Sequence, residues 1–408
     1  MALTGFGDGQ TDPRDLTAEL LRRCLQARWR PEALEEARAL GSHGAVAWDA
    51  LVDTARAEGL GPLLYHATRG LDLLPAHVEQ ELRRQYLTTA RRNVLVFRAL
   101  EEVLCRLEDA HIPVILLKGA ALAQGVYGNV ALRPMDDVDL LVREAQVPGA
   151  IRAMASLGYS PVPPRAYRSQ VRLVHADRSS RPPFELHWSL FVSFYHQSML
   201  PADWLWETAL TQSIGDASAH ILGPEAQVLH LCGHLALHHG GENSPRGLWL
   251  HDVAALLDSY RGRLNWDALL ARAETCGLVL SLQQVLGEVT DVWRAPLASR
   301  VLDRVRALEP SSSELRALAA LSPTNRPALQ RFVSELAALP GFGQRLRVVW
   351  RNLFPPAAYL KEVYRLPHPL LLPLAYPYCW LAGLASALRA IVRPRFRSPG
   401  QPSASQAS

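Results

Sequence analysis

Carboxylates inside an apolar strand are the feature of this sequence that most constrains its fold. Asp137 and Asp139 alternate with Val138 and Leu140 near the end of the stretch Val114–Val142. A charged side chain among apolar residues is costly to bury unless a cation or hydrogen-bond donors neutralise it. Strand residues two apart point to the same face, so the carboxylates should lie roughly 6.5–7 Å apart on one side of a sheet. The sequence therefore predicts a divalent-cation site here, with Mg²⁺ or Mn²⁺ as the expected ion.

A lysine and a glycine precede the aspartates, at the end of another short apolar strand. Lys118 is one of only two lysines among 43 Lys and Arg residues, and Gly119 follows it directly. A compact ammonium group suits phosphate oxygens, and a glycine turn lets backbone N–H groups approach them. We therefore expect Lys118, Gly119 and Arg133, in the loop before the aspartates, to bind phosphate. Two alternatives stay open: Gly119 serves only as a tight turn, or Arg133 braces its loop by pairing with Asp136.

A third carboxylate, Glu185, interrupts the apolar strand Phe184–Trp188. If this strand lies beside residues 138–142, Glu185 completes a three-carboxylate cluster with the two aspartates. Such a cluster raises its own pKa values by repulsion unless a metal is bound. The alternative is an ion pair between Glu185 and Arg172 across a hairpin. His187 is expected to contact phosphate, to carry a proton or to hydrogen-bond the metal-binding carboxylates, or else to be a packed structural histidine.

Three histidines recur every four residues and line one face of a predicted helix: His230, His234 and His238. This spacing suits zinc, but no glutamate follows the first histidine as it does in zinc proteases. We expect His234 and His238 to face the cleft and contact phosphate or acceptor, with His230 in the core. Asp252 is expected to orient one of the histidines or to cap its helix.

The periodicity of apolar residues indicates an α+β fold, a small mixed β-sheet core flanked by N- and C-terminal all-helical regions. Strands are expected at 114–117, 138–142, 171–175 and 184–188, with a proline-rich linker at Ser160–Arg165. The predicted regions are a disordered tail (1–12), a helical region (13–110), an α/β core (111–222), a helical region completing the cleft (223–340), a C-terminal helical segment (341–398) and a disordered tail (399–408).

Composition and charge limit the classes of partner. A net charge of +4 indicates no general nucleic-acid surface. Five scattered cysteines and the lack of a secretory signal favour a cytoplasmic location. Residues 366–388 carry no formal charge and arginines follow up to Arg397. Four prolines argue against a bilayer span, so a peripheral membrane contact through 366–397 or a helix packed on the core are the alternatives.

The Lys-Gly, Arg-Pro-Met-x-Asp-x-Asp-Leu-Leu-Val and Glu-Leu-His-Trp elements together resemble a poorly characterised bacterial nucleotidyltransferase family of the DNA polymerase β-like superfamily. The superfamily pattern is a glycine turn, then Asp-x-Asp, then a third carboxylate on a later strand. Here the matching positions are Gly119, Asp137 with Asp139, and Glu185. The resemblance covers roughly residues 45–260. The glycine turn of this superfamily is usually Gly-Gly or Gly-Ser, whereas this sequence has Gly119-Ala120. A phosphate-binding serine is therefore missing, and Lys118 is expected to substitute for it.

The resemblance implies a metal-dependent enzyme that moves a nucleoside monophosphate from an NTP, expected to be ATP, to an acceptor and releases pyrophosphate. Asp137, Asp139 and Glu185 would be the catalytic and metal-binding residues. The implied acceptor is a small molecule, sugar or peptide rather than nucleic acid. The alternatives are a catalytically inactive NTP-binding module and a membrane-peripheral assembly module on the same fold.

Overall fold

A computed structural model describes residues 13–42, 46–162, 169–178, 180–238, 246–321, 328–366, 368–378 and 380–381. The predicted tails at 1–12 and 399–408 lie outside the described residues. The fold is mixed α+β, with one sheet in the middle of the chain and helices before and after it, as predicted. The division into regions at residues 110, 222 and 340 stays a prediction.

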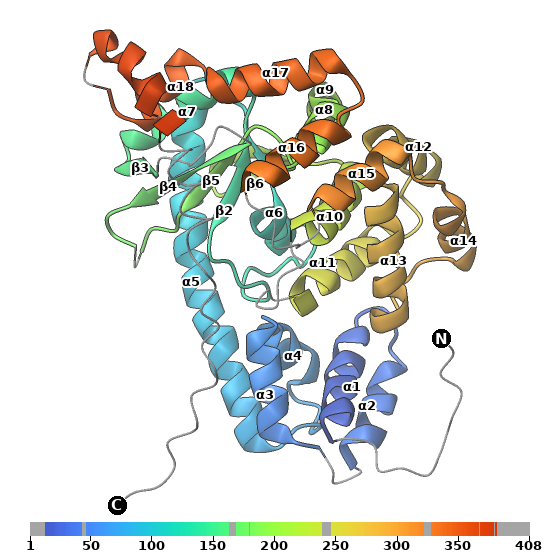
Figure 1. The fold of residues 1–408 in the computed structure, drawn as a ribbon. Coiled ribbons are helices and arrows are strands. Elements are labelled where there is room, and N and C mark those ends of the chain that lie inside the picture. The colour runs from blue at the N-terminus through green and yellow to red at the C-terminus, as the bar shows by residue number, and fades with distance from the viewer. Residues whose placement is uncertain are drawn as a thin grey trace, which may run out of the picture.

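The chain opens with helices, because apolar residues recur there at three- and four-residue spacing. The last of them, α5, runs through much of the height of the molecule and joins the N-terminal helices to the sheet (Figure 1). The N-terminal helices are α1 (Pro13–Gln26), α2 (Ala33–Ser42), α3 (Trp48–Ala57), α4 (Gly61–Thr68) and α5 (Ala76–Asp109).

A seven-stranded mixed sheet follows, in the order β3-β4-β5-β2-β1-β7-β6. β2 pairs in parallel with β5 and antiparallel with β1, and β1 pairs in parallel with β7. The strands are β1 (Ile115–Leu116), β2 (Val138–Leu141), β3 (Tyr159–Val162), β4 (Gln170–His175), β5 (Phe184–His187), β6 (Leu210–Ile214) and β7 (Ala217–Ile221). Between them lie α6 (Lys118–Gly125), η1 (Glu144–Gln146), α7 (Val147–Ala155), α8 (Phe194–Met199) and α9 (Ala202–Glu207).

Strand alternation sorts the side chains of β2 and β5 onto two faces. Val138 and Leu140 of β2, with Phe184 and Leu186 of β5, pack into a core that also includes residues of α5 and α7. Asp139, Glu185 and His187 therefore share the opposite face. The apolar residues hold the strands in register, and the polar residues between them all point to one side.

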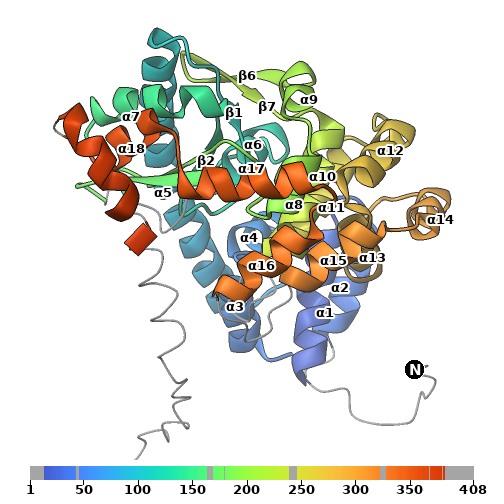
Figure 2. The ribbon, with the colours of Figure 1, turned by 45° about the horizontal axis from the view of Figure 1, so that its top comes forward.

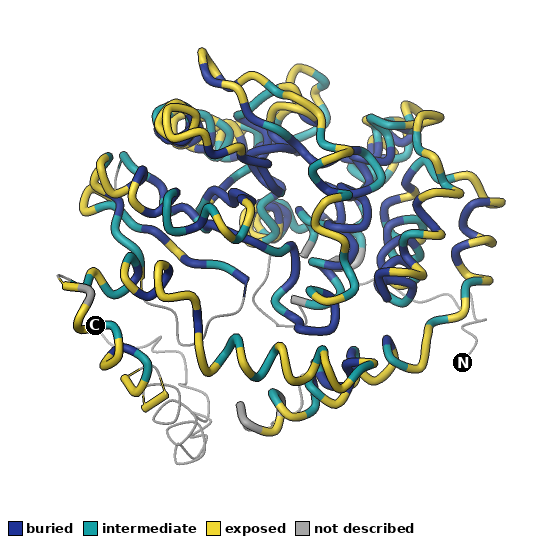
Figure 3. The backbone as a smooth tube through the Cα atoms, turned by 90° about the horizontal axis from the view of Figure 1, so that it is seen from above, coloured by how far each residue is buried: buried dark blue, intermediate teal, exposed yellow. Residues whose placement is uncertain are grey.

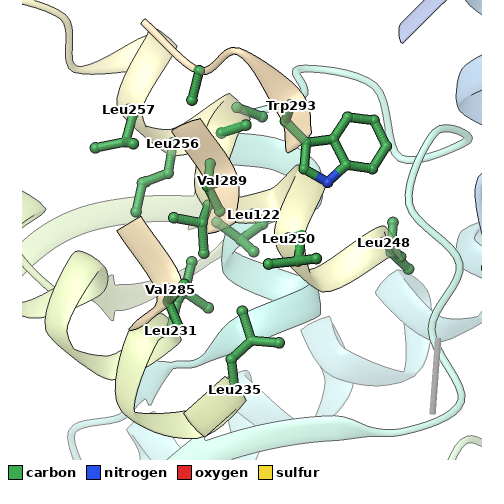
Figure 4. Close-up of a cluster of buried hydrophobic side chains, with 14 of the residues drawn as sticks. Leu122, Leu231, Leu235, Leu248, Leu250, Leu256, Leu257, Val285, Val289 and Trp293 are labelled. Carbon is green, nitrogen blue, oxygen red and sulfur yellow. The ribbon is translucent and has the colours of Figure 1, made fainter. Parts of the chain in front are cut away.

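Helices dominate the described residues after the sheet. α10, α11 and α13 pack with α6 on one face of the sheet, whereas α18 packs with α7 on the other. Leu122 of α6 lies in one apolar cluster with Leu231 and Leu235 of α10, side chains of α11, and Val285 of α13 (Figure 4). The later elements are α10 (Pro224–His238), α11 (Arg246–Ser259), α12 (Trp266–Cys276), α13 (Val279–Trp293), α14 (Ser299–Ala307), α15 (Ser312–Leu321), α16 (Ala328–Ala338), α17 (Phe342–Leu353), α18 (Ala357–Val363) and η2 (Pro369–Leu371).

Three strands differ from the sequence predictions. The proline-rich segment 160–165 was predicted as a linker, but Tyr159–Val162 forms β3. β3 is an edge strand, where a proline such as Pro161 removes no hydrogen bond from a central ladder. The hairpin of β6 and β7 was not predicted, although its two-residue Gly215-Asp216 connection is a turn signal.

The uncharged segment 366–388 is described only in part, because residues 367, 379 and 382–388 lie outside the described residues. Its described part forms η2 and a short helix at 372–378. Within the ranges that the structure describes, no helix is long and apolar enough to cross a membrane.

Candidate active site

The parallel pairing of β2 and β5 brings the predicted carboxylates together. Asp139 and Glu185 are direct partners in the strand register, so their Cα atoms lie side by side on adjacent strands. Residues opposite each other in a sheet have their side chains on the same face. The predicted adjacency of the two strands is thus confirmed, and it gives a cluster drawn from segments 46 residues apart in sequence.

His187 joins these two carboxylates. One ligand atom from each of Asp139, Glu185 and His187 lies within 4.8 Å of the others. His187 Nε2 is 2.8 Å from Asp139 Oδ1 and 3.7 Å from Glu185 Oε2. Carboxylate oxygens and an imidazole nitrogen are ligands for divalent cations, and carboxylates in particular suit Mg²⁺ and Mn²⁺. The three side chains could therefore hold a metal ion.

Asp137 lies at the entry to β2 and lines the same cleft. Burial, followed by the charges of Asp139 and Glu185, raises the pKa of its carboxyl group to about 6. Asp139 behaves in the opposite way: burial disfavours its charge, but Lys118 and His187 outweigh that effect and lower its pKa. The site thus contains more negative charge than its own cations neutralise, which is the condition a bound cation would relieve.

Lys118 and Gly119 stand where β1 ends and α6 begins. Lys118 has a positive φ of 46°, uncommon for a residue with a side chain. Its Nζ donates to Asp139 Oδ1 at 3.0 Å. A Cβ atom on Gly119 would lie 2.5 Å from Arg133 Nη1 and 2.8 Å from Met135 Cγ. Glycine at position 119 therefore allows the chain to pass directly over the Arg133 guanidinium group.

Arg133 forms a buried ion pair that the sequence analysis missed. Its Nη2 donates to Asp252 Oδ2 at 2.9 Å, and both residues are almost fully buried. The Tyr127 hydroxyl donates to Asp252 Oδ1 at 2.8 Å and is 2.9 Å from His251 Nδ1. The partner expected for Asp252 was therefore wrong, and so was the alternative in which Arg133 pairs with Asp136, whereas phosphate contact by Arg133 stays a prediction. Asp252 holds an arginine and a tyrosine, because a buried carboxylate needs a cation, and Arg133 does not pair with Asp136.

Asp136 is a solvated neighbour of the site. Its side chain is 98% exposed and lies 3.3 Å from Arg92 Nη2.

Glu185 shows both of the arrangements considered from sequence. It belongs to the carboxylate cluster, and it also accepts hydrogen bonds from Gln170 at 2.8 Å and Arg172 at 3.4 Å. Gln170 and Arg172, both on β4, therefore hold the Glu185 side chain in its position in the cluster.

A cleft of about 980 Å³ opens over the cluster. Its walls come from three parts of the chain: Arg56 and Arg84 from α3 and α5, the strand residues, and His234 with Trp249 from α10 and α11. His234 lines the cleft and its ring lies 6.0 Å from that of Trp249. His230 is buried. The side chain of His238 lies outside the described residues, so its predicted role stays a prediction.

Raising the pH should lower the free energy of unfolding of the metal-free protein, because Asp137 becomes ionised. The folded state keeps a proton on this group up to a pKa of about 6, whereas an unfolded aspartate loses it near the ordinary value of 3.8. Stability present at low pH is therefore lost as the pH rises through this window. We expect a loss of about 1–2 kcal/mol, after allowance for solvent screening of a partly exposed group.

Urea unfolding of the parent chain and of Asp137→Asn, both in chelator, measures this effect. The difference between their free energies of unfolding should change between about pH 4 and pH 7, and added Mg²⁺ should shift it in favour of the parent chain, which keeps the carboxylate. A difference that is independent of pH would contradict this account of Asp137.

Removing Asp252 should destabilise the protein strongly. Asp252→Ala leaves Arg133 as a buried, unpaired charge, so the free energy of unfolding should fall by about 3–5 kcal/mol. The double variant Arg133→Met with Asp252→Leu removes both charges and should recover much of that loss. Urea denaturation of the three proteins gives the values, and a double variant as unstable as Asp252→Ala would show that the charge pair is not the cause.

Comparison with known proteins identifies the family. No curated protein and no solved structure matches the chain significantly. The sequence model described as "uncharacterised nucleotidyltransferase" matches residues 44–293, a range that contains the glycine turn, the carboxylate cluster and the walls of the cleft. The match covers more than half of the 408 residues, so this chain belongs to the uncharacterised nucleotidyltransferase family.

Proposed function

We propose that the protein transfers a nucleoside monophosphate from an NTP, with ATP as the expected nucleotide, to a hydroxyl or similar acceptor, and releases pyrophosphate. The observation that carries the proposal is the pairing of Asp139 with Glu185 across parallel strands, with Asp137 two residues away, at the floor of a large cleft. Family membership supports nucleotidyl transfer in general. The nucleotide, the acceptor and the roles of individual residues belong to the proposal.

The triphosphate would lie over the turn between β1 and α6. Lys118 supplies a positive charge there, and Gly119 leaves the backbone accessible next to the guanidinium of Arg133. Because Lys118 also donates a hydrogen bond to Asp139, its ammonium group would contact both the triphosphate and the carboxylate cluster. His187 and His234 border the same space and would contact phosphate or acceptor.

In the reaction, the acceptor oxygen attacks the α-phosphorus and forms a new P–O bond. The bond from that phosphorus to the bridging oxygen breaks, and its electron pair leaves with pyrophosphate. Glu185 would take the proton of the acceptor hydroxyl, with Gln170 and Arg172 holding the carboxylate in place. Most of the catalytic effect in such reactions comes from positioning and charge stabilisation, which fits a site of fixed, buried groups.

Asp137, Asp139 and Glu185 would hold the divalent cation, Mg²⁺ or Mn²⁺. Burial, followed by the negative charges of Asp139 and Glu185, raises the pKa of Asp137, and the charge part of this effect supports the assignment. When bound, such an ion neutralises triphosphate charge and lowers the pKa of the acceptor hydroxyl.

The acceptor would be a small molecule, sugar or peptide. Polar and charged side chains from the strands line the cleft beside the carboxylate cluster, and Trp249 with His234 gives it one aromatic wall. Arginines at its edge do not form an open basic surface for nucleic acid, because Arg56 and Arg84 both bind Glu81.

A double variant and a matched control variant test the proposal directly. Purified protein is incubated with each labelled NTP, Mg²⁺ and cell extract, and transferred label is measured. Asp137→Asn with Asp139→Asn should reduce transfer on the order of 1,000-fold or more. Asp136→Asn is the matched control, because Asp136 is the exposed neighbour and its loss should leave transfer unchanged. Transfer that survives in the double variant would overturn the proposal.

A catalytically inactive NTP-binding protein is the second candidate, and Lys118 favours it. Its ammonium group already neutralises one oxygen of Asp139, and the turn lacks a serine hydroxyl. Calorimetry separates the two functions. Tight, Mg²⁺-dependent NTP binding without turnover on any acceptor supports the inactive protein, whereas binding that needs no metal contradicts both.

A further inference from the structure

Exposed apolar side chains concentrate in one short part of the protein. Of the 17 large apolar side chains that are exposed among the described residues, 11 lie within residues 342–381. Soluble proteins normally scatter such residues singly, and a concentrated patch marks an interaction site. This C-terminal patch therefore needs a partner that covers it.

The patch begins on α17. Phe342, Leu346 and Trp350 are spaced four residues apart, so they share one side of the helix. They are 79%, 56% and 61% exposed. The rest of the helix contacts the protein, because Val348 packs against the small buried cluster of Tyr195, Ala317, Ala338 and Leu339, and Arg345 donates to Leu339 O. α17 lies along the outside of the molecule with no buried residue (Figure 2 and Figure 3).

The patch continues into the chain that follows. Phe354 stands between Trp350 and Trp380, with ring centroids 4.4 and 5.6 Å away. Trp380 Nε1 donates to Leu353 O at 2.6 Å. The remaining exposed members of the patch are Leu353, Leu370, Leu371, Leu374, Tyr378 and Leu381. One aromatic and aliphatic surface thus runs from α17 to residue 381.

The same part of the sequence is strongly basic. Residues 340–408 contain nine Lys or Arg and a single acidic residue, Glu362, whereas the rest of the chain contains 34 Lys or Arg and 38 Asp or Glu. The basic excess of the protein therefore lies in the C-terminal part of the sequence, which also contains the patch. Arg347 is exposed on α17 next to the apolar residues. A charge asymmetry of this kind favours an anionic partner.

We propose that α17 and the exposed apolar side chains of residues 370–378 and 380–381 dock on a membrane surface that contains anionic lipids. Tryptophan and tyrosine prefer the boundary between headgroups and acyl chains, and arginines beside them bind acidic headgroups. The helix lies in the plane of the membrane and does not cross it. A second copy of this chain would meet the same positive charge on its partner, which repels and disfavours self-association. This inference does not depend on the proposed catalytic activity.

Flotation of the full chain with lipid vesicles tests the proposal. We expect binding to vesicles of equal parts phosphatidylcholine and phosphatidylglycerol, and much weaker binding to phosphatidylcholine alone. Phe342→Ser, Leu346→Ser and Trp350→Ser together should lower the partition coefficient about 100-fold or more. Arg347→Glu should lower it about tenfold at low salt, with a smaller effect at high salt.

A matched control changes exposed apolar residues elsewhere. Val94→Ser with Leu315→Ser removes side chains of similar exposure from α5 and α15 and should leave binding unchanged. Thermal unfolding confirms that each variant is folded. The proposal is overturned if the folded parent chain does not float with anionic vesicles, or if the triple variant floats as well as the parent. It is also overturned if sedimentation shows a dimer that the triple variant abolishes while lipid binding is absent.

Discussion

The ion pair between Lys118 and Asp139 is the interaction on which the architecture of the site depends. Asp139 sits in a central strand, where an uncompensated charge would cost several kcal/mol. Lys118 reaches it from the end of the neighbouring strand by adopting a left-handed backbone conformation, and His187 adds a second polar contact from the strand on the other side. One carboxylate is thereby fixed by residues from both adjacent strands, so β1, β2 and β5 must keep their register for the charge to be satisfied.

A second buried pair, Arg133 with Asp252, extends this constraint to the helical region. It joins the loop before β2 to α11 over 119 residues of sequence. Gly119 lies against the guanidinium group of Arg133 and is the neighbour of Lys118, so the two ion pairs meet at a single turn. The sheet and the helices that wall the cleft are thus positioned relative to each other by charge pairs as well as by the apolar cluster around Leu122.

Sequence reasoning was most successful where the determining interactions are local. Alternation within a strand is a local property, so the common face of Asp137 and Asp139, and of Glu185 with His187, could be predicted from short segments. Asp252 could not be assigned to Arg133, because α11 is apolar on most of its surface and gives no sign of which face meets the loop. The β6–β7 hairpin was not predicted, although its Gly-Asp pair is a turn signal, because its strands contain few of the β-branched and aromatic residues that usually identify strands.

The charge balance of the cluster explains why such a costly arrangement is kept. Lys118 and His187 satisfy Asp139, and Gln170 with Arg172 holds Glu185. The remaining member, Asp137, is partly buried and also bears the repulsion of both carboxylates, and these two effects together raise its pKa. A fold optimised for stability alone would replace such a group with a neutral one. The same repulsion that opposes its ionisation strengthens the attraction for a cation, so a local loss of stability becomes a driving force for binding.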